Sequence, residues 1–186
     1  MDSGVGTTHL AIAAANYVVN EWGTPAAVVE LASRPCIQSL DMDGSGDTYF
    51  VEEGVGYYPH IVSDRLPMLL NGDYPYLIMD LGSGESEWQE FLRCDLRYLV
   101  ASLSPWRIDR AENFMLSHMQ PDGMEHMHQQ YFTALLTVTG NVYEKRRFQQ
   151  IYHVPVRSIP FMADPFRLEK DQLAFFQELL LGGKRH

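Results

Sequence analysis

The sequence predicts an α/β fold with three layers, in which helices cover both faces of a mainly parallel β-sheet. Short apolar runs alternate with helical stretches at the spacing of βαβ units. A glycine-rich turn also leads directly into a long helix of small residues at the start of the chain. The length of 186 residues and the 46% hydrophobic content suit one sizeable core. We therefore expect residues 1–186 to form a single domain.

The helices and strands are expected to alternate along the chain. The first helix spans Leu10–Asn20, and Gly23-Thr24-Pro25 separates it from an apolar strand over residues 26–31. Ser63 predicts the cap of a short helix over residues 64–70. The other expected strands cover residues 49–51, 55–58, 76–81, 96–102, 135–138 and 156–159. The other expected helices cover residues 85–92, 109–119, 143–152 and 169–181.

The turn Ser3-Gly4-Val5-Gly6-Thr7-Thr8-His9 predicts an anion-binding cradle. Its glycines let backbone N–H groups close around an anion, and the next helix directs the positive end of its dipole to the same place. A working phosphate loop has a lysine directly after its second glycine, whereas this chain has Thr7 there. The three lysines of the chain, at positions 145, 170 and 184, are distant from the turn in sequence. The sequence therefore predicts a cradle without its catalytic cation.

Gly4-Val5-Gly6, Thr8 and Leu10-Ala11, followed by the strand Ala27-Val28-Val29-Glu30-Leu31, resemble the deviant Walker A region of the ParA/MinD ATPases. That family includes the pilus-positioning proteins called CpaE or TadZ. The resemblance implies a P-loop NTPase-like fold that binds ATP or ADP with Mg²⁺. The two lysines of the family pattern fall at Asp2 and Thr7 here, so hydrolysis is not expected.

The resemblance also implies the residues of the nucleotide site. Asp80 ends an apolar strand at the position of the family's Walker B aspartate, so Thr8 and Asp80 become the metal candidates. The alternative is that Asp80 only caps the Gly82-Ser83 turn. The implied nucleotide-binding residues are Gly4, Val5, Gly6, Thr7, Thr8, His9 and Asp80.

A phosphate loop normally follows a central strand, and here the sequence begins at the loop. We therefore expect an N-terminally shortened domain that lacks the usual first strand. Such a sheet would have an unpaired slot, and pairing with a second chain, as in a homodimer, would relieve it.

Composition restricts the partners and the compartment. The formal charge of −10 argues against a nucleic-acid partner, because phosphate backbones require clustered cations. No apolar run reaches the roughly 20 residues of a membrane span. Cys36 and Cys94 form neither a metal pattern nor a disulfide pattern. These features favour a cytoplasmic protein with protein partners.

Other motifs have ordinary explanations. Residues 41–52 match the spacing of an EF-hand loop, but the flanking sequence does not predict its two helices, so a solvated acidic loop is expected. Residues 118–128 contain histidines and methionines that suit copper or nickel, although a surface turn accounts for them more simply. Residues 159–166 correspond to the family's adenine-contacting region, or they form a proline-built turn. Ser83 and Ser104 lack a nucleophile motif.

Two functions follow from the sequence. The favoured one is a non-catalytic or weakly nucleotide-binding ParA/MinD-like module for interaction or positioning, with pilus or cell-pole assembly as the nearest analogue. The alternative is an active ATPase switch whose lysine is supplied by a partner or whose site is restored by a missing N-terminal segment. A third, weaker reading is a metal-binding regulator.

Overall fold

The computed structural model describes residues 6–31, 36–41, 49–82, 87–118 and 132–182. The contacts divide the chain into two compact units. The N-terminal unit contains Gly6–Glu87 and Met162–Phe176, and the C-terminal unit contains Trp88–Phe161 and the chain from Gln177 onward. Whether residues 1–186 behave as one domain stays a prediction.

The N-terminal unit is built on a four-stranded sheet of order β2-β3-β1-β4. Strand β1 is parallel to both β3 and β4, and only the outer strand β2 is antiparallel to its neighbour. Its elements are α1 (Thr7–Trp22), β1 (Ala26–Glu30), η1 (Ile37–Leu40), β2 (Phe50–Glu52), β3 (Val55–Tyr58), η2 (Ser63–Arg65), α2 (Leu66–Leu70) and β4 (Tyr76–Asp80).

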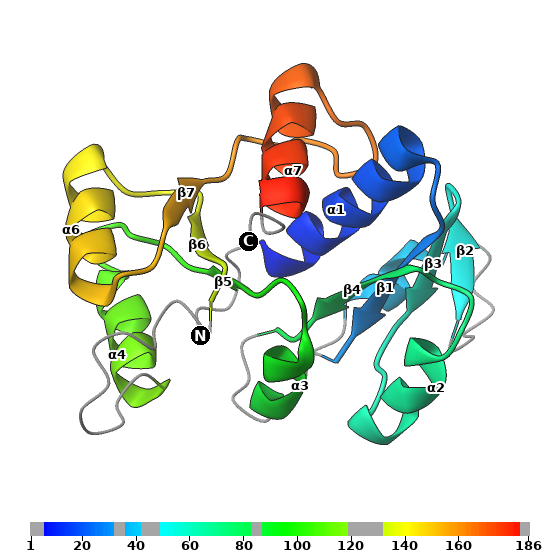
Figure 1. Cartoon of the computed structure of the whole chain (residues 1–186). Coiled ribbons are helices and arrows are strands. Elements are labelled where there is room, and N and C mark those ends of the chain that lie inside the picture. The colour runs from blue at the N-terminus through cyan, green and yellow to red at the C-terminus, as the bar shows by residue number, and fades with distance from the viewer. Residues whose placement is uncertain (1–5, 32–35, 42–48, 83–86, 119–131, 183–186) are drawn as a thin grey trace. The chain divides into compact units, whose positions relative to one another are not determined.

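The apolar residues of this unit form its buried core. All five residues of β1 are buried, as expected of a parallel strand covered on both faces. Helix α1 covers one face of the sheet and α2 lies at the other (Figure 1). On the α2 face the core consists of Val29, Leu31, Ile61, Leu66 and Leu69. Helix α1 ends at Gly23, whose φ of 59° allows the chain to turn toward β1.

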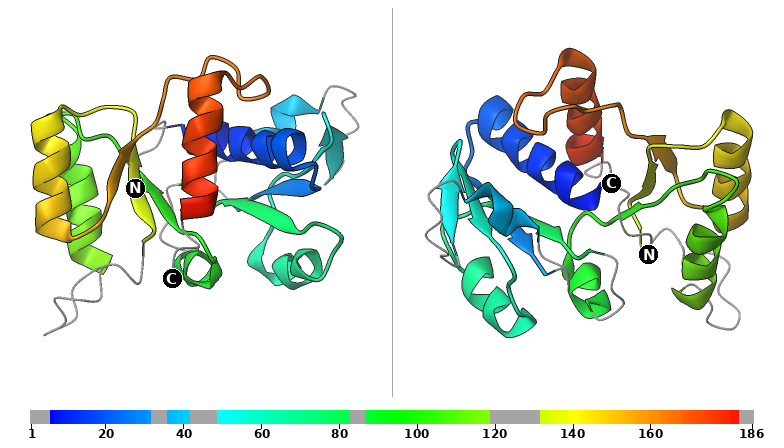
Figure 2. Two further views of the ribbon diagram at one scale, coloured as in Figure 1. Left: turned by 45° about the horizontal axis from the view of Figure 1, so that its top comes forward. Right: turned by 180° about the vertical axis from the view of Figure 1, so that it is seen from behind.

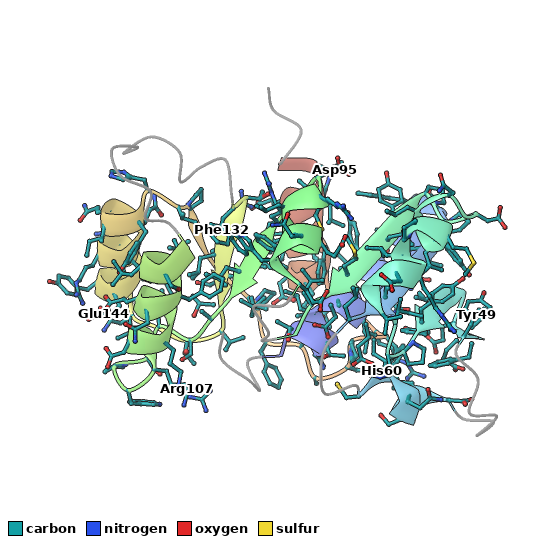
Figure 3. All side chains as sticks on the ribbon, turned by 90° about the horizontal axis from the view of Figure 1, so that it is seen from below. Tyr49, His60, Asp95, Arg107, Phe132 and Glu144 are labelled. Atoms are coloured by element: carbon teal, nitrogen blue, oxygen red, sulfur yellow. The ribbon has the colours of Figure 1, made fainter. Side chains whose placement is uncertain are left out.

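The C-terminal unit has a three-stranded parallel sheet of order β5-β6-β7. Helices α4 and α6 lie side by side (Figure 2), and Arg147 of α6 pairs with Glu112 of α4 at 3.4 Å. Phe132, labelled in Figure 3, packs among the rings of Trp88, Phe91 and Phe114. The elements are α3 (Trp88–Arg93), β5 (Tyr98–Val100), α4 (Ile108–His118), β6 (Ala134–Thr137), α6 (Val142–Tyr152) and β7 (Val156–Ser158); α7 (Lys170–Gly182) begins in the other unit.

The predicted α/β class is confirmed, with parallel pairing in both sheets. Boundaries differ where local chemistry intervenes. The helix expected over residues 64–70 is a 3₁₀ turn followed by a short α-helix, with a proline at the start of the α-helix. The strand expected over residues 96–102 is shorter, because it pairs with β6 only over Tyr98–Val100. None of the described helices has the length and apolarity to cross a bilayer.

Candidate functional site

The start of α1 carries the described part of the predicted cradle. Gly6 has a φ of 87°, a left-handed conformation that favours glycine, and no atom of the described residues lies within 4 Å of where a Cβ would stand. The amide of Leu10 donates to the Gly6 carbonyl at 2.9 Å. The amides of residues 7–9 precede that bond, and no side chain caps the helix. They are therefore directed at the space that an anion would occupy. Gly4 and Val5 lie outside the described residues.

Thr8 and Asp80 meet at the carboxyl end of β4. The Thr8 hydroxyl donates a hydrogen bond of 2.5 Å to Asp80 Oδ2, which joins the first turn of α1 to the sheet. Asp80 Oδ1 accepts the amide of Gly82 at 2.9 Å, so Asp80 also has the turn-capping role that sequence reasoning offered as an alternative. The Asp80 side chain thus fixes both the helix start and the turn that follows the strand.

Glu30 is a second carboxylate at this edge, and sequence reasoning missed it. It is the register partner of Asp80, and it is fully buried. Its Oε1 accepts the amide of Cys36 at 2.7 Å and the amide of Ile37 at 3.3 Å. A buried carboxylate needs such donors, since burial of an unpaired charge is costly. Glu30 ends an apolar strand as Asp80 does, so the same argument could have found it.

Cys36 connects the two carboxylates. Its Sγ lies 3.4 Å from the Thr8 hydroxyl and 3.5 Å from Glu30 Oε1. Partial burial raises the pKa of the Cys36 thiol, a hydrogen bond from Thr8 lowers it, and the charges of Glu30 and Asp80 raise it further. The thiol is therefore mostly protonated at neutral pH, which disfavours a role as nucleophile. It completes a polar chain from Glu30 through Cys36 and Thr8 to Asp80.

The oxygens of Thr8 and Asp80 fit a magnesium ion. Mg²⁺ prefers hard oxygen ligands and is usually held by one or two protein groups with water and substrate phosphates. A hydroxyl and a carboxylate already within hydrogen-bond distance, beside a free helix start, form such a pair. The oxygens of Glu30 accept the backbone amides of Cys36 and Ile37, so Glu30 is better suited to fixing the backbone at these two residues than to binding a metal. When bound, the ion would neutralise phosphate charge next to α1.

Among the described residues, Asp80 forms side-chain hydrogen bonds with Thr8 and Gly82 and not with His9. The Nε2 atom of His9 is buried and has no hydrogen-bond partner within the described part of the chain, although the residue as a whole is only partly buried. Thr7 is partly buried in the first turn of α1.

The other sequence motifs are not assembled into sites among the described residues. Most of the acidic segment over residues 41–52 lies outside them, and its last three residues form strand β2 rather than the start of the helix that an EF-hand needs. Residues 119–131, with most of the histidine-methionine stretch, and Ser83 are also outside. In the described part of the chain, no three His, Cys, Asp or Glu side chains could hold a metal together. Cys36 and Cys94 are both free thiols.

Similarity to known proteins lies in the fold. No protein-family model matches the sequence. No curated protein matches it either. Among solved structures, the chain is similar to a ParA family ATPase from Chlorobium tepidum, with 14% identity, a TM-score of 0.60, and coverage of 98% of this chain and 86% of that one.

Two further structures agree. The MinC:MinD cell division complex of Aquifex aeolicus matches with 14% identity and a TM-score of 0.63, over 100% of this chain and 94% of that one. A plasmid partition protein from Borrelia burgdorferi matches with 12% identity and a TM-score of 0.60, over 96% and 92% of the two chains. The chain therefore has the α/β, P-loop NTPase-like fold of the ParA/MinD ATPases.

Proposed function

We propose that this chain is a ParA/MinD-like interaction module whose cradle holds Mg²⁺ and nucleotide only weakly and does not hydrolyse it. The observation that carries the proposal is the Thr8–Asp80 pair at the start of α1 combined with Thr7 in the place of the phosphate lysine. The pair offers oxygen ligands for a cation. The lysine that would reach the β- and γ-phosphates is absent from that position.

Weak binding without turnover follows from what remains. Catalysis of phosphoryl transfer depends almost entirely on positioning and on neutralising charge. Here a triphosphate would meet backbone amides, a helix dipole and the Thr8–Asp80 pair. These groups support binding, but they do not replace the cation at position 7.

Exposed apolar side chains in the C-terminal unit support a role in protein contacts. Loops follow β5, β6 and β7 at the carboxyl edge of the sheet, and hydrogen bonds from Leu103 to Thr139 and from Ile159 to Thr137 tie them together. These loops and the first turn of α6 expose apolar side chains: Trp106 (80%), Val138 (53%) and Phe161 (86%) in the loops, and Val142 (63%) and Tyr143 (71%) in α6. Aromatic residues gathered at a surface are typical of interaction sites.

The process we propose is positioning, as in pilus or cell-pole assembly. The support is the fold and its neighbours, one of which is a MinC:MinD cell division complex and another a plasmid partition protein. Fold analogy is an associational argument, so the partner has to be found by experiment.

Calorimetry with Mg-ATP and Mg-ADP tests the cradle. We expect a Kd no tighter than about 0.1 mM and no phosphate release. Asp80→Asn should weaken the binding further, whereas Asp73→Asn, on the same unit, should not change it. Micromolar binding with turnover would contradict the proposal and favour the ATPase switch. Complete absence of nucleotide binding would contradict the part of the proposal that concerns the cradle and would leave only the interaction role.

A further inference from the structure

Cys36 adds a sulfur atom to the candidate cation site. Its Sγ lies 3.4 Å from the Thr8 hydroxyl oxygen, and that oxygen lies 2.5 Å from Asp80 Oδ2. The three side chains come from the first turn of α1, the residue before η1 and the end of β4. All three residues belong to the N-terminal unit. Cys36 is exposed as a residue, so an ion from solution can reach its sulfur.

Two buried carboxylates lie beside this sulfur, and their hydrogen-bond donors among the described residues are all neutral. Glu30 is 0% exposed and Asp80 is 3% exposed. Asp80 accepts the Thr8 hydroxyl and a backbone amide. Glu30 accepts the Cys36 thiol and two backbone amides. Because buried negative charge is costly unless it is compensated, these carboxylates favour the binding of a cation next to them.

The spacing of the donor atoms suits a tetrahedral ion. Zn²⁺ with bonds of about 2.3 Å to sulfur and about 2.1 Å to oxygen holds these two atoms about 3.6 Å apart. The observed separation of Cys36 Sγ and the Thr8 oxygen is 3.4 Å. Two oxygens on the same ion lie about 3.4 Å apart, so the Thr8–Asp80 pair, at 2.5 Å, has to widen by about 1 Å. An ion would therefore replace the hydrogen bond between the two oxygens, with little change at the sulfur.

The sulfur changes which ion the site prefers. Mg²⁺ is a hard cation that takes oxygen ligands, whereas a thiolate selects softer ions such as Zn²⁺. In the part of the chain that the structure describes, no three His, Cys, Asp or Glu side chains could hold a metal together. Cys36 and Asp80 are two such side chains, and the Thr8 hydroxyl is the third donor. Three protein donors leave a position for water or a phosphate oxygen, as in zinc sites that stay open to ligands.

We propose that Cys36, Asp80 and Thr8 bind a thiophilic divalent cation, of the class of Zn²⁺ and Cd²⁺, in preference to Mg²⁺. The inference rests on the proposed function for the placing of a cation at Thr8 and Asp80, and it adds the third donor and the class of ion. Protonation of the free thiol does not prevent this role, because the metal takes the place of the proton. The site needs no nucleotide.

Binding of the ion releases a proton and involves no oxidation or reduction. The bond between the ion and Cys36 Sγ forms as the S–H bond breaks, and the proton passes to solvent. The Thr8 hydroxyl keeps its proton and gives a lone pair to the ion. Asp80 Oδ2 exchanges its hydrogen bond from Thr8 for the ion, while Oδ1 continues to accept the Gly82 amide. The turn after β4 therefore stays fixed when the ion binds.

Titration of the full chain with Cd²⁺, without nucleotide and in a phosphine reductant, tests the proposal. A bond between Cd²⁺ and a thiolate has an ultraviolet charge-transfer band that imidazole and carboxylate ligands do not produce. We expect a band that saturates at one thiolate per chain. Cys36→Ser should remove it, and Cys94→Ser, the matched control, should retain it. Asp80→Asn should raise the Cd²⁺ dissociation constant at least about ten-fold, the loss that even groups outside the first ligand shell cause.

Alkylation of the wild-type protein provides a measurement that needs no variant. Cd²⁺ should protect Cys36 from iodoacetamide and leave the rate at Cys94 unchanged, even with about a hundred-fold excess of Mg²⁺.

The proposal is overturned if the wild type gives no thiolate band, if folded Cys36→Ser keeps the band, or if Asp80→Asn binds Cd²⁺ as tightly as the wild type. Displacement of Cd²⁺ by the Mg²⁺ excess, or alkylation of Cys36 at the same rate with and without Cd²⁺, also overturns it. Because the titration contains no nucleotide, a failure of Mg-ATP to bind in calorimetry counts against the proposed function alone.

Discussion

Thr8 and Asp80 are separated by 72 positions in the sequence and are joined by a hydrogen bond of 2.5 Å. This contact brings the first turn of α1 to the carboxyl edge of the sheet. Ligands bind at that edge in parallel α/β folds. The amides of residues 7–9 and the Asp80 carboxylate therefore face one place, which decides how the cradle can be tested.

Restoring the missing cation should strengthen nucleotide binding. In Thr7→Lys, the new ammonium group would stand directly after Gly6, in the position that reaches the β/γ-phosphates. A charge-assisted hydrogen bond contributes about 1.5–3 kcal/mol, so we expect Mg-ATP to bind about ten- to hundred-fold more tightly. Calorimetry measures the change. Thr7→Gln provides the uncharged control, and equal gains in both variants would mean that charge is not the cause.

Glu30 should be important for stability, although it lies at the candidate site. Glu30→Gln keeps one oxygen that can accept the amides of Cys36 and Ile37, but it removes the negative charge that strengthens these bonds and puts an NH₂ donor in the place of the second oxygen, which accepts Ile37 at 3.4 Å. We expect a loss of about 1–3 kcal/mol in the free energy of unfolding. Urea denaturation measures it. Glu52→Gln, on the partly exposed strand β2, is the matched control and should change stability by less than about 0.5 kcal/mol.

Two tyrosines, the buried Tyr57 and the partly buried Tyr98, should respond differently to loss of the hydroxyl group. Tyr98 donates a hydrogen bond of 2.6 Å to the Leu179 carbonyl, so Tyr98→Phe should lower the free energy of unfolding by about 1 kcal/mol. The hydroxyl of Tyr57 is buried and faces the Asn16 side chain, but it makes no hydrogen bond of good geometry among the described residues, so Tyr57→Phe should change stability by less than about 0.5 kcal/mol. Thermal and urea denaturation distinguish the two. A large loss in Tyr57→Phe would mean that its hydroxyl has a partner in solution.

Both cysteines should alkylate slowly at neutral pH. Burial raises the pKa of Cys94 to about 11, from a model-compound value of 9.0. The pKa of Cys36 is also raised. Because the thiolate is the reactive form, the rate at Cys94 should rise about ten-fold per pH unit up to about pH 11. Iodoacetamide labelling followed by mass spectrometry measures each site. Rapid labelling of folded Cys94 at pH 7 would contradict the assigned burial.

Gly140 should tolerate a side chain less well than Gly6. Gly140 has a φ of 123°, and a Cβ there would lie 2.8 Å from Leu103 Cβ. Gly140→Ala therefore adds a clash to backbone strain, and we expect a loss of about 2–4 kcal/mol. Gly6→Ala meets no atom within 4 Å, so its cost should be about 1 kcal/mol of backbone strain. Equal losses in urea denaturation would mean that the Leu103 loop moves aside.

The fold class could be predicted from the sequence because helices and strands depend largely on residues that are neighbours in the chain. The continuous apolar run of β1 predicts a strand buried on both faces, and the structure has all five of its residues buried. Gly23 marks the end of α1 for a backbone reason, its positive φ. The boundaries of the helices and strands were harder to predict. The short extent of β5 depends on its pairing with β6, which no residue of β5 encodes alone.

Only part of the candidate site could be predicted from the sequence. The glycine turn and the strand-ending Asp80 are local signals, and they predicted two parts of the cradle. Cys36 belongs to no distinctive sequence motif, and its contact with Thr8 depends on the pairing of β1 with β4. Glu30 had the same strand-end signal as Asp80, but an acid within an apolar strand is ambiguous until its burial and its donors are known.

The sequence by itself determined the alternation of strands and helices, the glycine conformation at Gly6 and the lack of a lysine at position 7, because each depends on residues adjacent in the chain. Only the tertiary structure decided that Glu30, Cys36, Thr8 and Asp80 form one polar chain and that β4 pairs with β1 as its one strand neighbour among the described residues. Both depend on sheet order, which is set by the packing of distant segments against a common core.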